Sequence, residues 1–423
     1  MRIGKKLLAV LFATALAFVA CGDDETEPSG SGNGSGGMPG AGGSGDGTGG
    51  SGGSSNGTGG SGPGGEGGAG GTPGSGGSGG GSGAGGAGGS GGAGSEGPFN
   101  YAFVTSTTHT GNLGGLSGAD EICNQRAADA GLPGTYVAWL SDSSTNAIDR
   151  LGNANGWLRT DGRIFARSRE ALANPKQIVH PLILDENQEP VDSYVFTGTE
   201  KDGTRSENSC SDWPSEASDE GAVMVGKTAY VGDQWTGPLT VWCSMAHPIY
   251  CLGIDHDRPI PMPKVEGRIA FSTRRKFLAD QGIDAADEIC AREAEEAGLE
   301  GTFKALLGTT TFSPISRFSL DGDTWVRPDG VPIWDNAADA LEFPPVAPLL
   351  IDAFGKISDP GVGVWLGATS LDSVGTDTCE DWSSAEAELH ADRAQKGTAG
   401  PHWIQYRTNR CNSQNAALIC LQE

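Results

Sequence analysis

Hydrophobic and polar positions along this chain predict the same short elements in two consecutive stretches. Residues 136–140 alternate between the two classes as a half-buried strand does, and residues 303–307 occupy the same place in the second stretch. A helical segment precedes each of them. Its apolar residues fall near one face at helical spacing: Ile122, Ala127 and Ala130 in the first copy, Ile289, Ala294 and Ala297 in the second.

Both helices carry signals at their ends. Ser117 and Asp284 are the expected N-caps, each with an acidic residue a turn further on that suits a helix start. Gly131 and Gly298 stand where a left-handed residue without a Cβ closes a helix. The pattern therefore predicts two short capped helices, each carrying one cysteine on or beside its apolar face.

Further strand signals follow in the same order in both copies. The opening strands begin near Tyr101 and Ile269. Segments 157–162 and 325–330 each end in an Asp-Gly turn. Additional strands are predicted at 181–185, 194–198, 348–352 and 364–367, and a closing hairpin is predicted from 241–243 and 249–252.

The nine cysteines support the same duplication. Cys21 stands alone near the N-terminus, and the other eight form two sets of four with nearly equal gaps. Even sets in an exported chain favour disulfides, with three connectivities possible in each set. Zinc is the rival interpretation, but no Cys-x-x-Cys pair and no nearby histidine supports it. The sets are Cys123, Cys210, Cys243 and Cys251, then Cys290, Cys379, Cys411 and Cys420.

The N-terminal segment predicts export and a membrane anchor. Residues 1–20 hold a basic start and an apolar run, which is typical of a signal peptide. Ala20 and Cys21 resemble a bacterial lipobox, in which the cysteine is lipidated; ordinary signal cleavage is the alternative. Residues 21–98 are acidic and then rich in Gly and Ser, a composition that predicts a disordered tether.

Length and charge bound the rest of the chain. Of 423 residues, those after the tether suit two domains, predicted at 99–254 and 267–423 with a Pro-rich linker at 255–266. The formal net charge of −25 argues against nucleic acid as a partner, because phosphate binding needs a basic surface.

Four motifs recur in order in both domains, and together they resemble a known family. They are Gly-Ala-Asp or Ala-Ala-Asp before the helical cysteine, Gly-Leu-x-Gly-Thr-Tyr/Phe, a strand like Val-Trp-Leu-Gly, and Cys-x-x-Trp. This set resembles the endostatin domains of certain collagens, which are distant members of the C-type lectin-like fold. The resemblance implies an α+β fold with mostly antiparallel twisted sheets in each domain.

The same resemblance implies how the cysteines pair. In the family the first cysteine bonds to the fourth and the second to the third. By position, this gives the pairs Cys123–Cys251, Cys210–Cys243, Cys290–Cys420 and Cys379–Cys411.

Calcium-binding lectins of this fold use acids and amides in a long loop, because calcium prefers several oxygen ligands. The corresponding loops here are 199–209 and 368–378. They lack the Glu-Pro-Asn type of motif, so no calcium or other cofactor is expected and solvated acids are the better interpretation. The candidate ligand-binding residues are Glu200, Asp202, Glu207, Asn208, Asp372 and Asp377.

Other chemistry finds little support. Trp157, Trp213, Trp325 and Trp382 hold equivalent positions and are expected in the cores. Arg159 and its neighbours are expected on a solvated face. No nucleophile elbow, phosphate loop or HExxH motif is present, so an enzyme is not expected.

Together these features predict a lipoprotein of the bacterial cell envelope, anchored through Cys21 in the outer membrane or at the cell surface. Its two disulfide-bonded, lectin-like domains are expected to bind a glycan or protein ligand. A structural envelope protein without a soluble ligand is the alternative, and a secreted hydrolase is a third.

Overall fold

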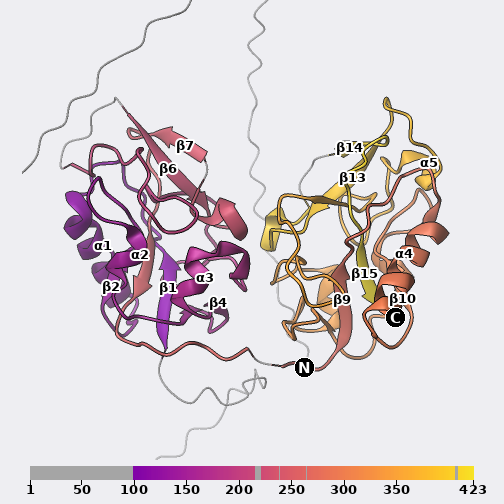
Figure 1. The fold of residues 1–423 in the computed structure, drawn as a ribbon, viewed down its shortest axis with the longest axis horizontal. Helices are drawn as coiled ribbons and strands as arrows, with labels where there is room; N and C mark the ends of the chain where they lie inside the picture. Colours follow the sequence, from indigo (N-terminus) through magenta and orange to yellow (C-terminus); the bar gives the residue numbers. More distant parts are fainter. Residues whose placement is uncertain (1–98, 215–220, 238, 263, 405–407) are drawn as a thin grey trace, which may run out of the picture. The chain divides into compact units, whose positions relative to one another are not determined.

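The structure is a computed structural model that describes residues 99–423 apart from 215–220, 238, 263 and 405–407. The predicted signal peptide, Cys21 and the tether lie outside the described residues. The described chain is an α+β protein in which one element order occurs twice, as repeat 1 (99–254) and repeat 2 (267–423) (Figure 1). The predicted α+β class is thereby confirmed.

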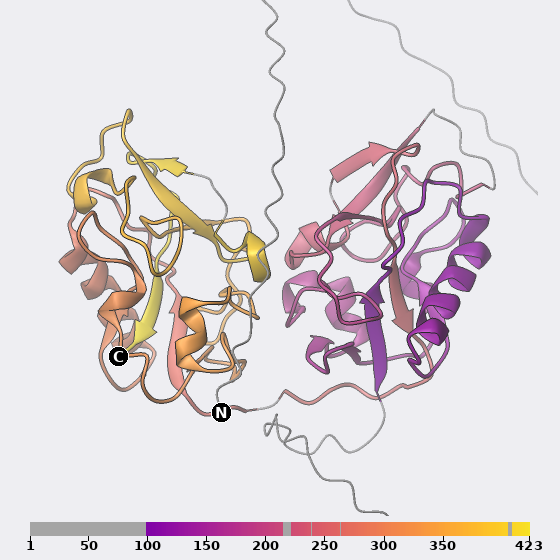
Figure 2. The same cartoon turned by 180° about the vertical axis from the view of Figure 1, so that it is seen from behind.

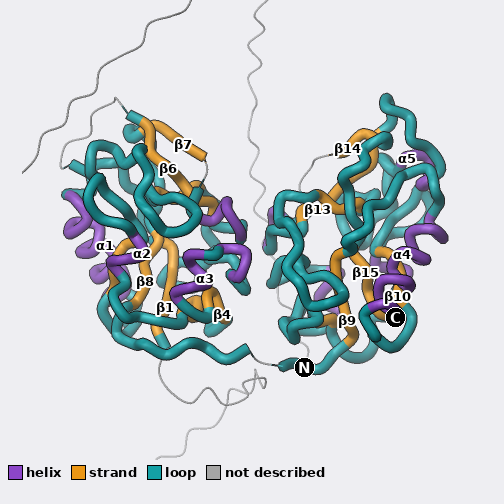
Figure 3. The backbone as a smooth tube through the Cα atoms, viewed as in Figure 1, coloured by secondary structure: helices purple, strands orange, loops and turns teal. Residues whose placement is uncertain are grey.

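Repeat 1 contains one long helix, α1, and two sheets. Much of the remaining chain is loop or short helix (Figure 3). Its elements are β1 (Asn100–Val104), α1 (Gly115–Asp129), β2 (Tyr136–Ala138), α2 (Ala147–Arg150), β3 (Trp157–Arg159), β4 (Ile164–Ala166), α3 (Arg169–Ala173), η1 (Pro175–Gln177), β5 (Tyr194–Phe196), β6 (Ala222–Lys227), η2 (Gly232–Trp235), β7 (Leu239–Trp242) and β8 (Tyr250–Gly253).

Repeat 2 follows the same plan with fewer short elements. These are β9 (Arg268–Ser272), α4 (Ile283–Glu296), β10 (Phe303–Ala305), η3 (Ile315–Arg317), β11 (Trp325–Val326), η4 (Ala337–Leu341), β12 (Gly363–Trp365), α5 (Cys379–Trp382), β13 (His390–Gln395), η5 (Gly400–His402), β14 (Thr408–Arg410) and β15 (Ile419–Gln422).

Each repeat is built on a larger sheet and a three-stranded sheet. The strand order is β2-β8-β1-β3-β4 in repeat 1 and β10-β15-β9-β11 in repeat 2. The smaller sheets run β5-β6-β7 and β12-β13-β14. Within these sheets pairing is antiparallel except between β1 and β3 and between β9 and β11. The last strand of each repeat pairs with its first, so both ends of a repeat lie together, away from its smaller sheet (Figures 1 and 2).

The predicted closing hairpin is wrong. Strands β7 and β8 belong to different sheets, because β7 pairs with β6 whereas β8 pairs with β1 and β2. The predicted strands at 181–185 and 348–352 are wrong as well. Each segment makes only isolated bridges, which join Leu184 to Pro190, Asp185 to Val104 and Ile351 to Ile357. A proline opens both segments and removes a donor that a strand needs.

The helix ends divide into one confirmed and one incorrect prediction. Gly131 and Gly298 follow the helices with φ of 70° and 71°, as a left-handed cap requires. The N-caps, however, are not Ser117 and Asp284. The helices start earlier, after Gly114 and Gly282, because the carbonyls of Trp213 and Trp382 accept backbone N–H groups there.

Each repeat has two disulfides, one that fixes its long helix and one that fixes its smaller sheet. The structure contains Cys123–Cys251, Cys210–Cys243, Cys290–Cys420 and Cys379–Cys411, which are the pairs that the family resemblance implies. The outer bridge of each repeat joins its long helix to its last strand, across 128 and 130 residues. The core placement of Trp157, Trp213, Trp325 and Trp382 is confirmed, since all four are fully buried.

Candidate functional site

The candidate loop of repeat 1 does not gather its acids around one point. Asp202 accepts hydrogen bonds from the backbone and hydroxyl of Thr204, which lower its pKa. Glu207 is exposed, and the carbonyl of Asn208 accepts the N–H of Met224. Glu200 closes a backbone turn with Gly203 and Thr204. Of these acids, the carboxylate of Asp202 thus stabilises its own turn.

The candidate loop of repeat 2 brings only one predicted residue beside another acid. Asp372 accepts from Ser370 within its own loop, at 2.6 Å. The carbonyl of Asp377 accepts the N–H of Asp392, a strand residue that is 6 % exposed. Burial raises the pKa of Asp392, and the nearby charge of Asp377 raises it further. Sequence reasoning had not singled out Asp392.

Metal ligation by these loops is not apparent in the described residues. In that part of the chain no three His, Cys, Asp or Glu side chains gather in a group that could hold a metal ion. The expectation that the protein carries no cofactor stays a prediction.

Both loops lead into a backbone feature that the sequence did not reveal. Four consecutive residues, Cys210 to Trp213, have φ between 50° and 66°, and Cys379 to Trp382 have φ between 53° and 68°. Each segment is one turn of left-handed helix built from residues other than glycine. Such a conformation costs roughly 1–2 kcal/mol per residue, so the fold must hold it in place.

The letters of Cys-x-Asp-Trp explain how repeat 1 holds this turn. Cys210 is bonded to Cys243. Asp212 accepts the N–H and hydroxyl of Ser143, at 2.6 and 2.5 Å. The buried indole of Trp213 donates to the carbonyl of Ser141, at 2.8 Å.

Repeat 2 uses the same three attachments. Asp381 accepts from the N–H and hydroxyl of Thr310, both at 2.7 Å, and Trp382 donates to Gly308 at 2.9 Å. Burial acts to raise the pKa of Asp381, but the hydrogen bonds from Thr310 and Thr378 outweigh it and lower the pKa. The variable position, Ser211 or Glu380, is exposed in both turns.

The disulfide of the first turn leads directly to an unusual surface residue. Trp242 precedes Cys243 at the end of β7 and is 62 % exposed. The other nine of the ten tryptophans, all within the described residues, are exposed by no more than 1 %. Leu239 and Met245 nearby are each 45 % exposed. Single exposed apolar residues are common on folded domains, but an exposed tryptophan marks a candidate contact surface, because tryptophan is enriched at interfaces.

The backbone of β7 adds polar groups beside Trp242. Met224 of β6 uses its N–H and carbonyl toward Asn208 and Thr197, away from β7. Because the backbone groups of successive strand residues face opposite sides, those of Val223 and Val225 face β7, where these residues pair with Val241 and Leu239. The backbone groups of Thr240 therefore face the free edge of the sheet. We call Leu239–Trp242 with Met245 the β7 edge.

The equivalent edge of repeat 2 is polar. Strand β14 has the sequence Thr-Asn-Arg, with Arg410 in the place of Trp242. A charged residue on an edge strand discourages contact with another strand or apolar surface. The sequence shows that Trp242 and Arg410 differ at matching positions, but only the structure shows that Trp242 lies outside the core.

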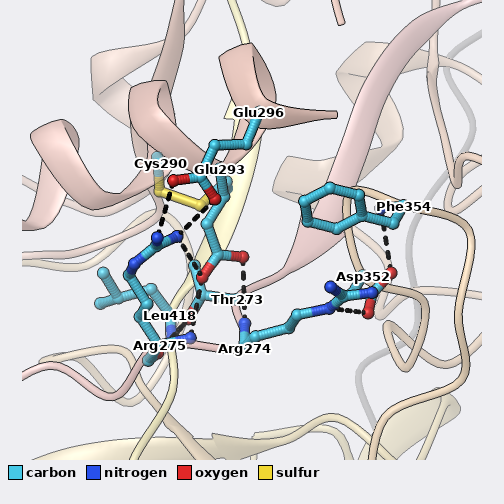
Figure 4. A network of polar contacts seen from close by, with 10 residues as sticks. Thr273, Arg274, Arg275, Cys290, Glu293, Glu296, Asp352, Phe354 and Leu418 are labelled. Atoms are coloured by element: carbon cyan, nitrogen blue, oxygen red, sulfur yellow. Dashed lines mark hydrogen bonds and ion pairs between the residues drawn. A yellow bond between two sulfur atoms is a disulfide. The ribbon is translucent and has the colours of Figure 1, made fainter. Parts of the chain in front are cut away.

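Two arginines of repeat 2 near helix α4, Arg274 and Arg275, are bonded within the fold (Figure 4). Glu293 is fully buried and accepts the backbone N–H groups of Arg274 and Arg275, at 3.0 and 2.8 Å. The guanidinium of Arg275 pairs with Glu296, and that of Arg274 pairs with Asp352. This network fixes the loop after β9 and pairs both of its arginine side chains with carboxylates.

The predicted solvated position of Arg159 is wrong. Its side chain is buried, pairs with Asp161 and donates to the carbonyl of Pro181 at 3.0 Å. Arg327 makes the matching contacts with Asp329 and Pro348. Both arginines thus join an Asp-Gly turn to the following loop.

Open hollows of about 640 and 700 Å³ lie at equivalent places beside α1 and α4. His109 and Glu121 line the first, and Lys276 and Arg292 are among the residues lining the second. Burial lowers the pKa of His109, and the charge of Arg126 lowers it further. Because their linings differ in charge, the two hollows do not suggest one shared ligand.

Comparison with known proteins gives one partial match. A family described as a protein of unknown function (DUF1554) matches residues 106–231, less than half of the chain. The match includes the left-handed turn of repeat 1 and ends before β7. No curated protein matches the chain. In the described residues no helix has the length and apolar character to cross a membrane.

Proposed function

We propose that this protein is an exported, lipid-anchored recognition protein of the bacterial cell envelope, and that repeat 1 binds a glycan at the β7 edge. Both repeats are proposed to have the C-type lectin-like fold. The nested disulfides, the helix joined to the last strand and the pair of sheets support this assignment. The lipid anchor at Cys21 and the tether at 21–98 remain sequence predictions.

The exposure of Trp242 carries the proposal. An indole held on a rigid strand can stack against the apolar face of a sugar ring, at a low cost in side-chain entropy. The adjacent disulfide and the pairing with β6 hold that strand. The acids of the loops 199–209 and 368–378, by contrast, do not gather at one site.

The polar groups around Trp242 suit a neutral, hydroxyl-rich ligand. The hydroxyl and backbone groups of Thr240 can exchange hydrogen bonds with sugar hydroxyls, whereas no residue of β7 carries a charge. The net charge of −25 further disfavours polyanions. We therefore expect neutral glycans to bind better than sulfated or phosphorylated ones.

A glycan array probed with the mature chain tests this function. We expect binding to neutral glycans that Trp242→Ala weakens by about 30-fold, the scale of a central aromatic contact. Arg410→Ala, at the matching place in repeat 2, is the control and leaves binding unchanged. Binding that Trp242→Ala does not alter, or no binding to any glycan, contradicts the proposal.

A second arm of the same experiment concerns calcium. Because Asp202 and Asp372 bond within their own loops, EDTA is expected to leave binding unchanged. Loss of binding in EDTA assigns the ligand to a calcium site at 199–209 or 368–378 instead. The absence of enzymatic activity stays a prediction.

A further inference from the structure

The inference concerns the bridge that joins the left-handed turn of repeat 1 to the proposed ligand site, and it rests on the function proposed above. Cys210 begins the turn, and its partner Cys243 directly follows Trp242. One covalent bond therefore connects a strained segment to the exposed indole.

The turn and the β7 edge share few other attachments. The Asp212 and Trp213 side chains bond to Ser143 and Ser141, which lie in the loop after β2 and not in β7. At the other side of the bridge, Cys243 donates its N–H to Gly221 and accepts that of Gly111. The disulfide is thus the direct connection from the turn to the strand end that carries Trp242.

All four bridges are buried, and this one is the least buried of them. Cys210 is 6 % exposed and Cys243 is 3 % exposed, whereas the other six bonded cysteines are exposed by 1 % or less. The matching bridge of repeat 2, Cys379–Cys411, is among those six. A dithiol must approach one sulfur to attack a disulfide, so we expect the least buried bridge, Cys210–Cys243, to react first.

We propose that Cys210–Cys243 is a redox switch, whose reduction releases the left-handed turn and displaces Trp242 from its binding position. The four φ angles between 50° and 66° provide the driving force, because residues other than glycine leave this region when a constraint is removed. Oxidation restores the turn and the site together.

The step is a thiol–disulfide exchange with a dithiol reductant, such as an extracytoplasmic dithiol protein. A thiolate of the reductant attacks one sulfur, the Cys210–Cys243 bond breaks and a mixed disulfide forms. The second reductant thiol resolves it. The protein gains two electrons and two protons as two cysteine thiols, and the reductant becomes a disulfide.

Graded reduction of the mature chain by dithiothreitol, followed by alkylation and mass spectrometry, tests the order of reaction. We expect Cys210 and Cys243 to be labelled first, at a dithiothreitol concentration at least tenfold lower than the one at which Cys379 and Cys411 are labelled. In the same samples, iodide quenching of tryptophan fluorescence reports Trp242, and we expect it to change when this pair is labelled. The switch is overturned if Cys210–Cys243 and Cys379–Cys411 are labelled together, or if iodide quenching is unchanged after the labelling of Cys210 and Cys243.

Variants of the exposed position in each turn test the role of strain. Ser211→Gly relieves a left-handed residue, so Cys210–Cys243 should become about fivefold harder to reduce at equilibrium, while Ser211→Val makes it easier. Glu380→Gly is the matched control and affects only Cys379–Cys411. If the wild type and both Ser211 variants are reduced equally, strain in the left-handed turn does not drive the switch.

The glycan measurement separates this inference from the proposed function. If glycans bind the oxidised chain, reduction of Cys210–Cys243 should weaken binding at least tenfold, and unchanged binding overturns the switch. If no glycan binds, the proposed function fails, whereas the labelling order and the quenching still decide whether the bridge controls Trp242.

Discussion

The smaller sheets of the two repeats have the same frame, meaning the same disulfide and hydrogen-bond attachments, but their edge strands differ in chemical character. Each is joined through a disulfide to a left-handed turn, and each turn is fixed by an aspartate and a tryptophan. Yet β7 exposes Trp242 where β14 presents Arg410. The difference shows that the two repeats keep the same attachments, while the residues at the edge of the smaller sheet vary between them.

The largest expected effect tests whether the two frames are equally anchored. Replacing the outer bridge by serines, Cys123→Ser with Cys251→Ser or Cys290→Ser with Cys420→Ser, should each lower the free energy of unfolding by about 4 kcal/mol, because both bridges close loops of similar length. Urea titration measures this. A large loss in one repeat only would show that the frames are not equivalent.

Acid should distinguish the repeats through His180. Burial, aided by the charge of Arg159, lowers the pKa of His180 to about 3 from its usual 6.5. The native state keeps this ring neutral, whereas the unfolded state takes up a proton below pH 6.5. The free energy of unfolding therefore falls as the pH drops from 6.5 toward 3, by about 3 kcal/mol at pH 4.

Repeat 2 has the buried Ala347 at the position of His180, so this acid sensitivity belongs to repeat 1. Urea titrations from pH 7 to pH 4 measure the slope, and His180→Ala should flatten it. A slope that the variant retains would assign acid sensitivity to other groups.

A smaller effect is expected from the aspartate that joins each long helix to the next strand and to an arginine beyond that strand. Asp120 pairs with Arg150 and accepts the N–H of Ala138, at 2.8 Å. Asp120→Ala leaves both donors without their partner and should cost about 2 kcal/mol in urea titration. Asp287→Ala, which breaks the matching pair with Arg317, should cost the same. A neutral result for either variant would break the equivalence.

The smallest effect is expected at the edge itself. Trp242→Arg gives β7 the residue of β14, and it should change the free energy of unfolding by no more than about 0.5 kcal/mol, because the indole is mostly exposed. Iodide should then lose its accessible fluorescence component, since the nine remaining tryptophans are buried. A clear loss of stability would show that Trp242 belongs to the frame.

The duplication, the helix and its glycine cap could be predicted because each depends on local sequence. The strand at 136–138 and the buried tryptophans followed from periodicity and residue type. The disulfide pairs came from the family resemblance, since spacing alone allowed three connectivities in each repeat.

The remaining features depend on contacts that are distant in sequence. The N-caps were misplaced because Trp213 and Trp382 provide carbonyl acceptors to the helix starts. The left-handed turns have no local preference for their φ angles; a disulfide, an aspartate and an indole impose them together. Trp242 has the residue type of a core position, and its exposure follows only from its place on an edge strand.

The pairing of first and last strands has a consequence for how such proteins arise. A module that starts and finishes on neighbouring strands can be copied in tandem, or inserted into a surface loop of another protein, without redrawing its sheets. The smaller sheet lies away from that junction in each repeat, so its free strand can change between copies while the join stays constant (Figure 1). Further gene duplication would therefore add new edge strands one at a time without changing the join.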